Sequence, residues 1–339
     1  FIISRDRFGI KPLYYCKIDQ EYYFASEQKV LIEIINSKNG HASLNSNYAA
    51  NYIMYGNCDF RDETFYKEIK LIKEASIYEL KTELKFLEEL YSLNFSKKKQ
   101  YDKEEFSTLF KECLSEHLNS DVSISCTLSS GLDSSIIFHA YKDFFKKKIM
   151  PFSLKSDFFE EQESEIISNR SKKYGYENNF VKINSQKLKY QFDHFLDMMD
   201  EPFVSDNLFY QSILTKEVKN RGNKVLYVGD GADEFFLGYD KYYYLYIIYL
   251  IKKFKFVNLF NYIFNNNIGT NLKNIFTSIF DYFVKGYGKR SILINDFGKK
   301  IINKQLQSTK IFDYYKSKKN FNNIIDEEIY SRFKYDIIK

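Results

Sequence analysis

The stretch VSISCTLSSGLDSS, residues 122–135, predicts a strand, a turn and the start of a helix. From Val122 to Leu128, apolar or β-branched residues alternate with small polar ones, which is typical of a buried strand that runs into a turn. The Ser, Gly and Asp residues at 129–133 supply that turn, and the apolar run from Ile136 to Phe138 indicates the first turns of a helix. The first backbone amides of a helix have no partner within the helix, so this order of elements creates a place where an anion can bind.

The side chains of this turn favour phosphate as the anion. Gly131 allows the backbone to approach a ligand closely, and the hydroxyl of Ser134 or Ser135 can donate at the helix start. Asp133 cannot hold a phosphate itself, because both groups are negative, so we interpret it as a candidate ligand of Mg²⁺. The GxxxxGK[ST] and GxGxxG patterns are absent from this turn, and an ordinary surface turn is the alternative interpretation.

A second stretch of chemical interest, KVLYVGDGADEFFLGY, covers residues 224–239. An apolar strand ends at Val228, and a Gly-rich turn then brings three carboxylates together within residues 229–234. Carboxylates this close repel one another unless a cation or a cationic partner is present. An exposed acidic turn is the alternative, but the apolar residues on both sides of the turn favour a site whose flanks are buried.

The elements around the two stretches predict a parallel sheet. Strands and helices that alternate at this spacing build such sheets with right-handed crossovers, and the sheets bind ligands at the carboxyl ends of their strands. Leu128 and Leu154 lie at two of these ends. The further predicted elements are strands at 150–154 and 180–183 and helices at 101–118 and 163–174, the last closed by Gly175.

Both stretches carry a resemblance to one family. SSGLDSS, residues 129–135, resembles the SGGLDSS pyrophosphate loop of the asparagine synthetase family, with Ser130 where the family usually has Gly. GDGADEFFLGY, residues 229–239, resembles the family's SGEGxDExFxGY, with Asp230 at the Glu position and Asp233 at the metal-binding Asp. The segment RDRFGIKPLYY, residues 5–15, is similar to a sequence motif near the end of the family's glutaminase domain.

The resemblance implies an α/β fold with two domains. It implies a parallel-sheet ATP-pyrophosphatase synthetase domain, of the adenine nucleotide alpha hydrolase type, with a helical C-terminal part. A partial N-terminal-nucleophile domain of antiparallel β-structure precedes it. The implied boundaries are residues 1–95 for the remnant of a class II glutamine amidotransferase domain and residues 100–339 for a truncated synthetase domain.

The resemblance also implies ATP and Mg²⁺ as cofactors and assigns residues to them. Mg²⁺ would lie between Asp133 and Asp233, and Asp230 would be catalytic by supporting formation of an acyl-adenylate. The implied reaction amidates a carboxylate, with aspartate becoming asparagine, ammonia or glutamine supplying nitrogen, and AMP and pyrophosphate released. The implied contacts to ATP and pyrophosphate are Leu128, Ser129, Ser130, Gly131, Leu132, Asp133, Ser134, Ser135, Leu154, Gly229 and Asp230.

The first 91 residues predict β-structure in short alternating segments. The segment RDRFGIKPLYY joins the first two predicted strands, and the residues alone indicate a hairpin held by Arg and Asp pairs. Cys16 lies inside a predicted strand, so we interpret it as a core residue and not as a nucleophile. The predicted strands are residues 1–3, 13–16, 22–25 and 76–80.

The family's glutaminase uses a chain-terminal Cys that lies upstream of its RDRFG segment, and no residue precedes Phe1 in this sequence. We therefore expect a fragment that does not hydrolyse glutamine, so that any amidation would depend on added ammonium. The family's catalytic Lys and DRMSM-like stretch are likewise not found before Lys339.

Composition narrows the class of protein and its partners. The 339 residues carry a net charge of +5 with basic and acidic residues interleaved, which implies neither a nucleic-acid nor a membrane partner. The four Cys show no CxxC spacing, which fits a reducing cytoplasm. The apolar run from Tyr242 to Ile251 is too short for a bilayer span, so we expect a buried helix. Small-molecule substrates are the expected partners, and a homodimer is left open.

Two other functions fit the sequence. One is a relative that amidates a different carboxylate, such as a sugar acid of a surface polysaccharide, or that closes a ring. The other is a non-catalytic remnant that acts as a binding or scaffold protein. No residue on the substrate side distinguishes these alternatives.

Overall fold

The computed structural model describes residues 1–38, 40–55, 62–91, 102–145, 149–155, 161–183, 188–203 and 205–265. The chain divides into two compact units, of which one comprises residues 98–232 and the other comprises residues 1–97 and 233–339. The domain boundaries expected from the sequence, at residues 95 and 100, remain a prediction.

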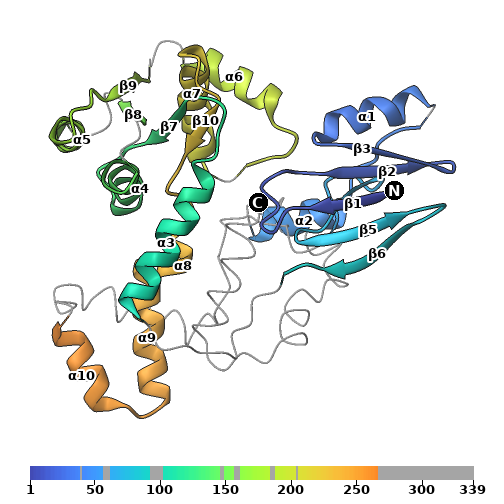
Figure 1. The fold of residues 1–339 in the computed structure, drawn as a ribbon. Coiled ribbons are helices and arrows are strands. Elements are labelled where there is room, and N and C mark those ends of the chain that lie inside the picture. The colour runs from blue at the N-terminus through green and yellow to red at the C-terminus, as the bar shows by residue number, and fades with distance from the viewer. Residues whose placement is uncertain are drawn as a thin grey trace. The chain divides into compact units, whose positions relative to one another are not determined.

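A parallel sheet forms the middle of the unit at residues 98–232 (Figure 1). Its strand order is β10-β7-β8-β9, and each of the three neighbouring pairs is parallel. The sheet predicted from the alternation of strands and helices is thereby confirmed. The strands are β7 (Ile124–Thr127), β8 (Met150–Lys155), β9 (Asn179–Lys182) and β10 (Val225–Tyr227).

The helices predicted at 101–118 and 163–174 begin and end within two residues of those positions, whereas the helices at 188–198 and 207–220 were not predicted. Asp102 caps the helix that begins at Lys103, because its carboxylate accepts from the amides of Glu104 and Glu105. Gly175, with φ of +73°, follows the helix predicted at 163–174 and allows the chain to turn there. The helices of this unit are α3 (Lys103–His117), α4 (Leu132–Asp143), α5 (Glu161–Lys173), α6 (Leu188–Met198) and α7 (Asn207–Asn220).

Two hydrophobic clusters hold helices against the sheet. In one, Phe138 and Tyr141 of α4 and Ile167 of α5 pack with strand β7. In the other, Phe195 of α6 and residues of α7 pack with β8 and β9. Both clusters consist of fully or nearly buried side chains, so the sheet is covered by helices, as parallel sheets require. The strand residues concerned are Cys126 and Leu128 in the first cluster and Phe152 and Val181 in the second.

The described part of residues 1–91 contains two three-stranded antiparallel sheets and two helices. The strands at residues 69–71 and 84–89 and both helices were not predicted from the sequence. The first sheet has the order β1-β5-β6 and the second β3-β2-β4. The elements are β1 (Ile2–Arg5), β2 (Tyr14–Ile18), β3 (Glu21–Ala25), α1 (Gln28–Ser37), α2 (Ser46–Tyr55), β4 (Ile69–Leu71), β5 (Ser76–Leu80) and β6 (Leu84–Glu89).

The hairpin expected around RDRFGIKPLYY is wrong, because β1 and β2 lie in different sheets. The segment between them crosses from one sheet to the other around the buried side chain of Arg5. Its guanidinium donates to the carbonyl oxygens of Ile72 at 2.7 Å, Gly9 at 2.8 Å and Lys11 at 3.1 Å. Arginine therefore satisfies backbone carbonyls that no strand partner satisfies.

Within residues 205–265, the last described range, three helices follow the parallel sheet, namely α8 (Ala232–Phe236), α9 (Asp240–Lys252) and α10 (Phe256–Asn265). Leu245, Ile247 and Ile248 of α9 are buried, as expected for the apolar run at 242–251. No helix in the described residues combines the length and the apolar character needed to cross a membrane. The aromatic residues noted further on, Tyr282, Phe283 and Tyr287, lie outside the described residues.

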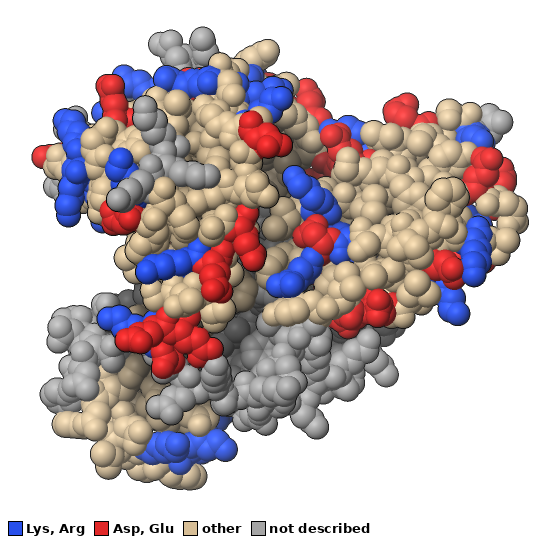
Figure 2. Space-filling view, in the orientation of Figure 1, with Lys and Arg blue, Asp and Glu red and all other residues tan. Residues whose placement is uncertain are grey.

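Charges and cysteines follow the sequence expectations where the structure describes them. Figure 2 shows basic and acidic side chains interspersed over the face that it draws. Cys16 and Cys126 are free and buried, and burial raises the pKa of both thiols. Cys16 packs in a cluster with Leu31, Ile35 and Ile69, so its interpretation as a core residue is confirmed.

Candidate functional site

The loop at residues 129–135 and the start of the acidic turn, residues 229–232, follow two neighbouring strands of the parallel sheet. Strands β7 and β10 are parallel neighbours in which Tyr227 is paired with Cys126, so the loops that follow them leave the sheet at the same edge. Leu128 continues β7 and donates its amide to Phe152 of β8 at 2.8 Å. Leu154 lies near the carboxyl end of β8. The fold therefore brings the ends of three strands together where ligands of such sheets bind.

Gly229 packs directly against the start of α4. A Cβ atom placed on Gly229 would lie 2.9 Å from the amide nitrogen of Ser134, 3.1 Å from Cβ of Asp133 and 3.2 Å from its carbonyl carbon. Real Cβ atoms essentially never come this close to a backbone nitrogen, so only glycine fits at this position. The acidic turn and the serine loop, about a hundred residues apart in sequence, are consequently in van der Waals contact.

The serine hydroxyls hold the loop at residues 129–135 in shape. Ser134 Oγ accepts from the amide of Ser129 at 3.0 Å and lies 2.8 Å from Ser129 Oγ. Ser129 Oγ in turn accepts from the amide of Gly131 at 3.1 Å, and Ser135 Oγ donates to the carbonyl of Gly131 at 2.6 Å. Ser134 and Ser135 are buried, so these bonds are protected from water.

The first turn of α4 presents backbone amides without a side-chain cap. Its N-cap residue is Gly131, which makes no side-chain hydrogen bond, in contrast to Asp102 at the start of α3. Leu132 and Asp133 follow, and the Leu132 side chain is 71% exposed. An uncapped helix start favours negative charge through its amides and the helix dipole. The loop thus has the polarity that an anion requires.

Two residues that the sequence analysis missed also contact the loop. Glu163 and Arg170 both belong to α5, seven residues apart and therefore on the same side of the helix. Glu163 Oε1 accepts from Ser130 Oγ at 2.6 Å, and Arg170 Nη1 donates to the carbonyl of Ser130 at 2.7 Å. Their spacing on a predicted helix was the available signal, but nothing in the sequence indicated which helix faces the loop.

Asp230 lies exposed after β10, and Gln211 of α7 orients it. Gln211 Nε2 donates to Asp230 Oδ2 at 3.0 Å. An exposed carboxylate held by one amide keeps its other oxygen accessible for a ligand or a cation. Gln211 is the third residue near the motifs that the sequence analysis did not name.

Asp233 lies in α8 and belongs to the other unit. A Cβ atom placed on Gly238 would come within 1.9 Å of Asp233 Oδ1, so the glycine of the FLGY segment makes room for this carboxylate. The neighbouring Glu234 is buried and accepts from the hydroxyl of Tyr239 at 2.6 Å. The last part of the acidic motif therefore has one partly buried and one buried carboxylate.

Mg²⁺ is the cation expected from the sequence, and carboxylates are the side chains that bind it. Within the described residues, no group of three or more His, Cys, Asp or Glu side chains could hold a metal ion. Mg²⁺ keeps several waters and takes one or two carboxylates together with substrate phosphates, so it needs no such group. Asp133, partly buried beside the uncapped helix start, has the carboxylate chemistry for this binding mode.

Comparison with known proteins identifies the family. A family model described as asparagine synthase matches residues 105–321, which is more than half of the chain. The chain belongs to the asparagine synthase family. A second model, described as a glutamine amidotransferase domain, matches residues 1–91. The two matched segments contain the motifs from which the resemblance was drawn.

Individual relatives of this asparagine synthase family chain are distant. It is 28% identical over 248 residues to asparagine synthetase [glutamine-hydrolyzing] 1 of Bacillus subtilis, covering 70% of this chain and 37% of that protein. It is 28% identical over 247 residues to putative asparagine synthetase [glutamine-hydrolyzing] 2 of Methanocaldococcus jannaschii, covering 70% and 46%. The chain thus spans less than half the length of these curated relatives.

Among solved structures, an NH3-dependent NAD synthetase from Campylobacter jejuni overlaps with 41% of this chain and 62% of its own. The TM-score is 0.31 and the sequence identity 16%. Likeness at this level supports no conclusion about the site.

The contact at Gly229 yields a prediction about stability. Gly229→Ala should lower the free energy of unfolding by about 1–3 kcal/mol, because the new methyl group meets backbone atoms that cannot move aside. Urea unfolding followed by circular dichroism measures the change. The matched control is Gly131→Ser, whose Cβ would meet only Ser129 Oγ, at 3.1 Å, and whose side chain suits an N-cap. Equal stability of the two variants would contradict the close approach.

Proposed function

We propose that this chain amidates a carboxylate at the expense of ATP, through an acyl-adenylate, and that aspartate is the carboxylate that becomes asparagine. Ammonia, free or derived from glutamine, supplies the nitrogen, and AMP and pyrophosphate leave. Membership of the asparagine synthase family supports this reaction class. The relatives from Bacillus subtilis and Methanocaldococcus jannaschii are named as an asparagine synthetase and a putative asparagine synthetase, which favours asparagine as the product.

One observation carries the proposal, namely the contact between Gly229 and the start of α4. It joins an anion-binding helix start to an acidic turn at the ligand-binding edge of a parallel sheet. A site for ATP and a carboxylate substrate needs both features, because phosphates require amides and a bound cation requires carboxylates.

The reaction has two steps whose charges these residues can stabilise. A carboxylate oxygen attacks the α-phosphorus of ATP, and the bond from that phosphorus to the bridging oxygen breaks to release pyrophosphate. Backbone amides of residues 129–135 would bind the negative charge that develops on pyrophosphate. Ammonia then attacks the acyl carbon, loses a proton, and expels AMP to leave the amide.

The remaining assignments belong to the same proposal. Residues 128–135, Leu154, Gly229 and Asp230 would contact ATP, and Asp230 would assist formation of the adenylate. Asp133 and Asp233 would hold Mg²⁺, which supplies Lewis-acid stabilisation of the phosphates when bound. Residues 1–95 would form part of a glutamine amidotransferase domain, in keeping with the second family model. A cytoplasmic location fits small-molecule substrates of this kind.

Exchange of labelled pyrophosphate into ATP tests the proposed function. Exchange that depends on aspartate supports the proposal as stated. Exchange that depends on another acid, such as a uronic acid, keeps the reaction class and replaces the substrate. No exchange with any of a panel of carboxylates, although ATP binds, would favour a non-catalytic binding protein.

The two proposed metal ligands give a prediction about nucleotide binding. Asp133→Asn and Asp233→Asn should each weaken ATP binding in the presence of Mg²⁺ by about tenfold or more, because each removes a negative oxygen ligand. Calorimetric titration of ATP with Mg²⁺ and with EDTA measures the difference. The control is Asp143→Asn at the exposed end of α4, which should bind like the parent. If both site variants keep the parental Mg²⁺ dependence, the metal assignment fails.

Asp230 gives a separate prediction about catalysis. Asp230→Ala should bind ATP within about twofold of the parent but lose pyrophosphate exchange by about a hundredfold, as expected when a group acts mainly in the transition state. ATP titration and the exchange assay are run on the same preparation. Asp193→Ala, an exposed carboxylate on α6, is the control. If Asp230→Ala exchanges pyrophosphate at the parental rate, Asp230 has no catalytic role and only forms part of the turn.

A further inference from the structure

The loop at residues 129–135 is held from behind by one guanidinium group. Arg170 Nη1 lies 3.2 Å from the carbonyl oxygen of Ser129, 2.7 Å from that of Ser130 and 3.3 Å from that of Gly131. It also donates to Ser135 Oγ at 2.5 Å. These four acceptors are all parts of the serine loop, so a single side chain of α5 contacts nearly its whole length.

We propose that Arg170 is a positioning residue for phosphate binding, acting through the direction of the loop's peptide groups. In a trans peptide group the carbonyl and the following amide point in opposite directions. Because the carbonyls of residues 129–131 all lie against Arg170, the amides of residues 130–132 are directed away from it. The amide of Gly131 donates to Ser129 Oγ, so the amides of Ser130 and Leu132 are the ones that this arrangement offers to an anion, together with the first turn of α4. The inference rests on the proposed function of this loop.

The chemistry of arginine suits this task. Three carbonyl oxygens gathered on one side of a loop repel one another, and a permanent cation among them offsets that repulsion. Hydrogen bonds that involve a charged donor are shorter and stronger than neutral ones, which fits the distances of 2.5 Å and 2.7 Å. All four contacts are made by the single nitrogen Nη1, so lysine, which carries the charge on a side chain one atom shorter, can replace them only in part.

Glu163 adds a second attachment from the same helix. It accepts from the hydroxyl of Ser130, the residue that stands where the resemblance has Gly. The Ser130 side chain is thereby directed to α5, on the side of Arg170. Because the Ser130 side chain points to α5, only backbone groups of this residue can face a ligand on the opposite side of the loop.

The test measures phosphate binding separately from binding of the nucleoside. Inorganic pyrophosphate and adenosine are titrated calorimetrically into the full 339-residue chain and into Arg170→Ala and Arg170→Lys. Arg170→Ala should bind pyrophosphate about tenfold or more weakly, and adenosine within about twofold of the parent, because only the amides lose their orientation. Arg170→Lys should recover part of the loss, and millimolar guanidinium chloride should restore pyrophosphate binding to Arg170→Ala.

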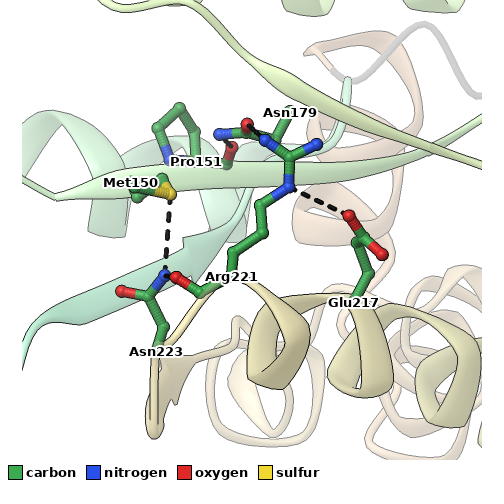
Figure 3. Close-up of polar contacts among 6 residues, drawn as sticks. All are labelled: Met150, Pro151, Asn179, Glu217, Arg221 and Asn223. Carbon is green, nitrogen blue, oxygen red and sulfur yellow. Dashed lines mark hydrogen bonds and ion pairs between the residues drawn. The ribbon is translucent and has the colours of Figure 1, made fainter.

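The matched control is Arg221→Ala. Arg221 follows α7 and donates to Glu217 Oε1 at 2.9 Å and to Asn179 Oδ1 at 2.8 Å (Figure 3). Asn179 is the first residue of β9, and its side-chain amide donates to the carbonyl oxygen of Pro151 near the start of β8. Arg221 therefore lies at the amino ends of these strands, whereas the loop lies at the carboxyl ends. This variant should bind pyrophosphate like the parent, and guanidinium should not change its affinity.

Each outcome has a distinct meaning. Parental pyrophosphate affinity in Arg170→Ala overturns the inference alone, provided that the parent binds. Equal weakening of pyrophosphate and adenosine, without rescue by guanidinium, shows a general structural role and also overturns it. A parent chain that binds neither pyrophosphate nor ATP overturns the proposed function, and this inference with it.

Discussion

The close approach of Gly229 to the amide of Ser134 is the contact on which the site depends. Strands β7 and β10 are neighbours, but neighbouring strands alone do not bring the loops that follow them into contact. A glycine without a side chain lets the acidic turn lie on the first turn of α4, where the uncapped amides are. The distance between the anion-binding groups and the carboxylates of the turn is therefore set by the volume of one missing methyl group.

Hydroxyl groups give the loop its rigidity. Ser129, Ser134 and Ser135 bond one another or the loop's backbone, and two of them are buried. Each such bond contributes about 1 kcal/mol net, but the larger effect is that buried donors and acceptors cannot rearrange without leaving a partner unsatisfied. Phe138 and Tyr141 of α4 pack in a buried cluster, so the helix that follows the loop is held in place against the sheet.

Arginine holds irregular backbone in both units of the chain. Arg5 donates to three carbonyl oxygens where the chain crosses between two antiparallel sheets. Arg170 contacts three carbonyl oxygens where the chain leaves β7 for α4. In each place the backbone has no ladder partner, and unsatisfied carbonyls in a partly buried loop are costly. A planar cation with five donors satisfies several of them at once.

The sequence by itself determined the elements whose signal is local. The alternation at residues 122–128 and the Ser-Gly-Asp turn defined the strand, loop and helix around Asp133, and the spacing of apolar residues defined α3. The order of strands and helices along the chain defined the parallel sheet. Only the tertiary structure decided that β1 and β2 belong to different sheets, that Gly229 touches α4, and that Arg170 faces the loop. Periodicity reports which side of an element is buried, whereas a hydrogen bond between residues 40 apart depends on how the elements pack.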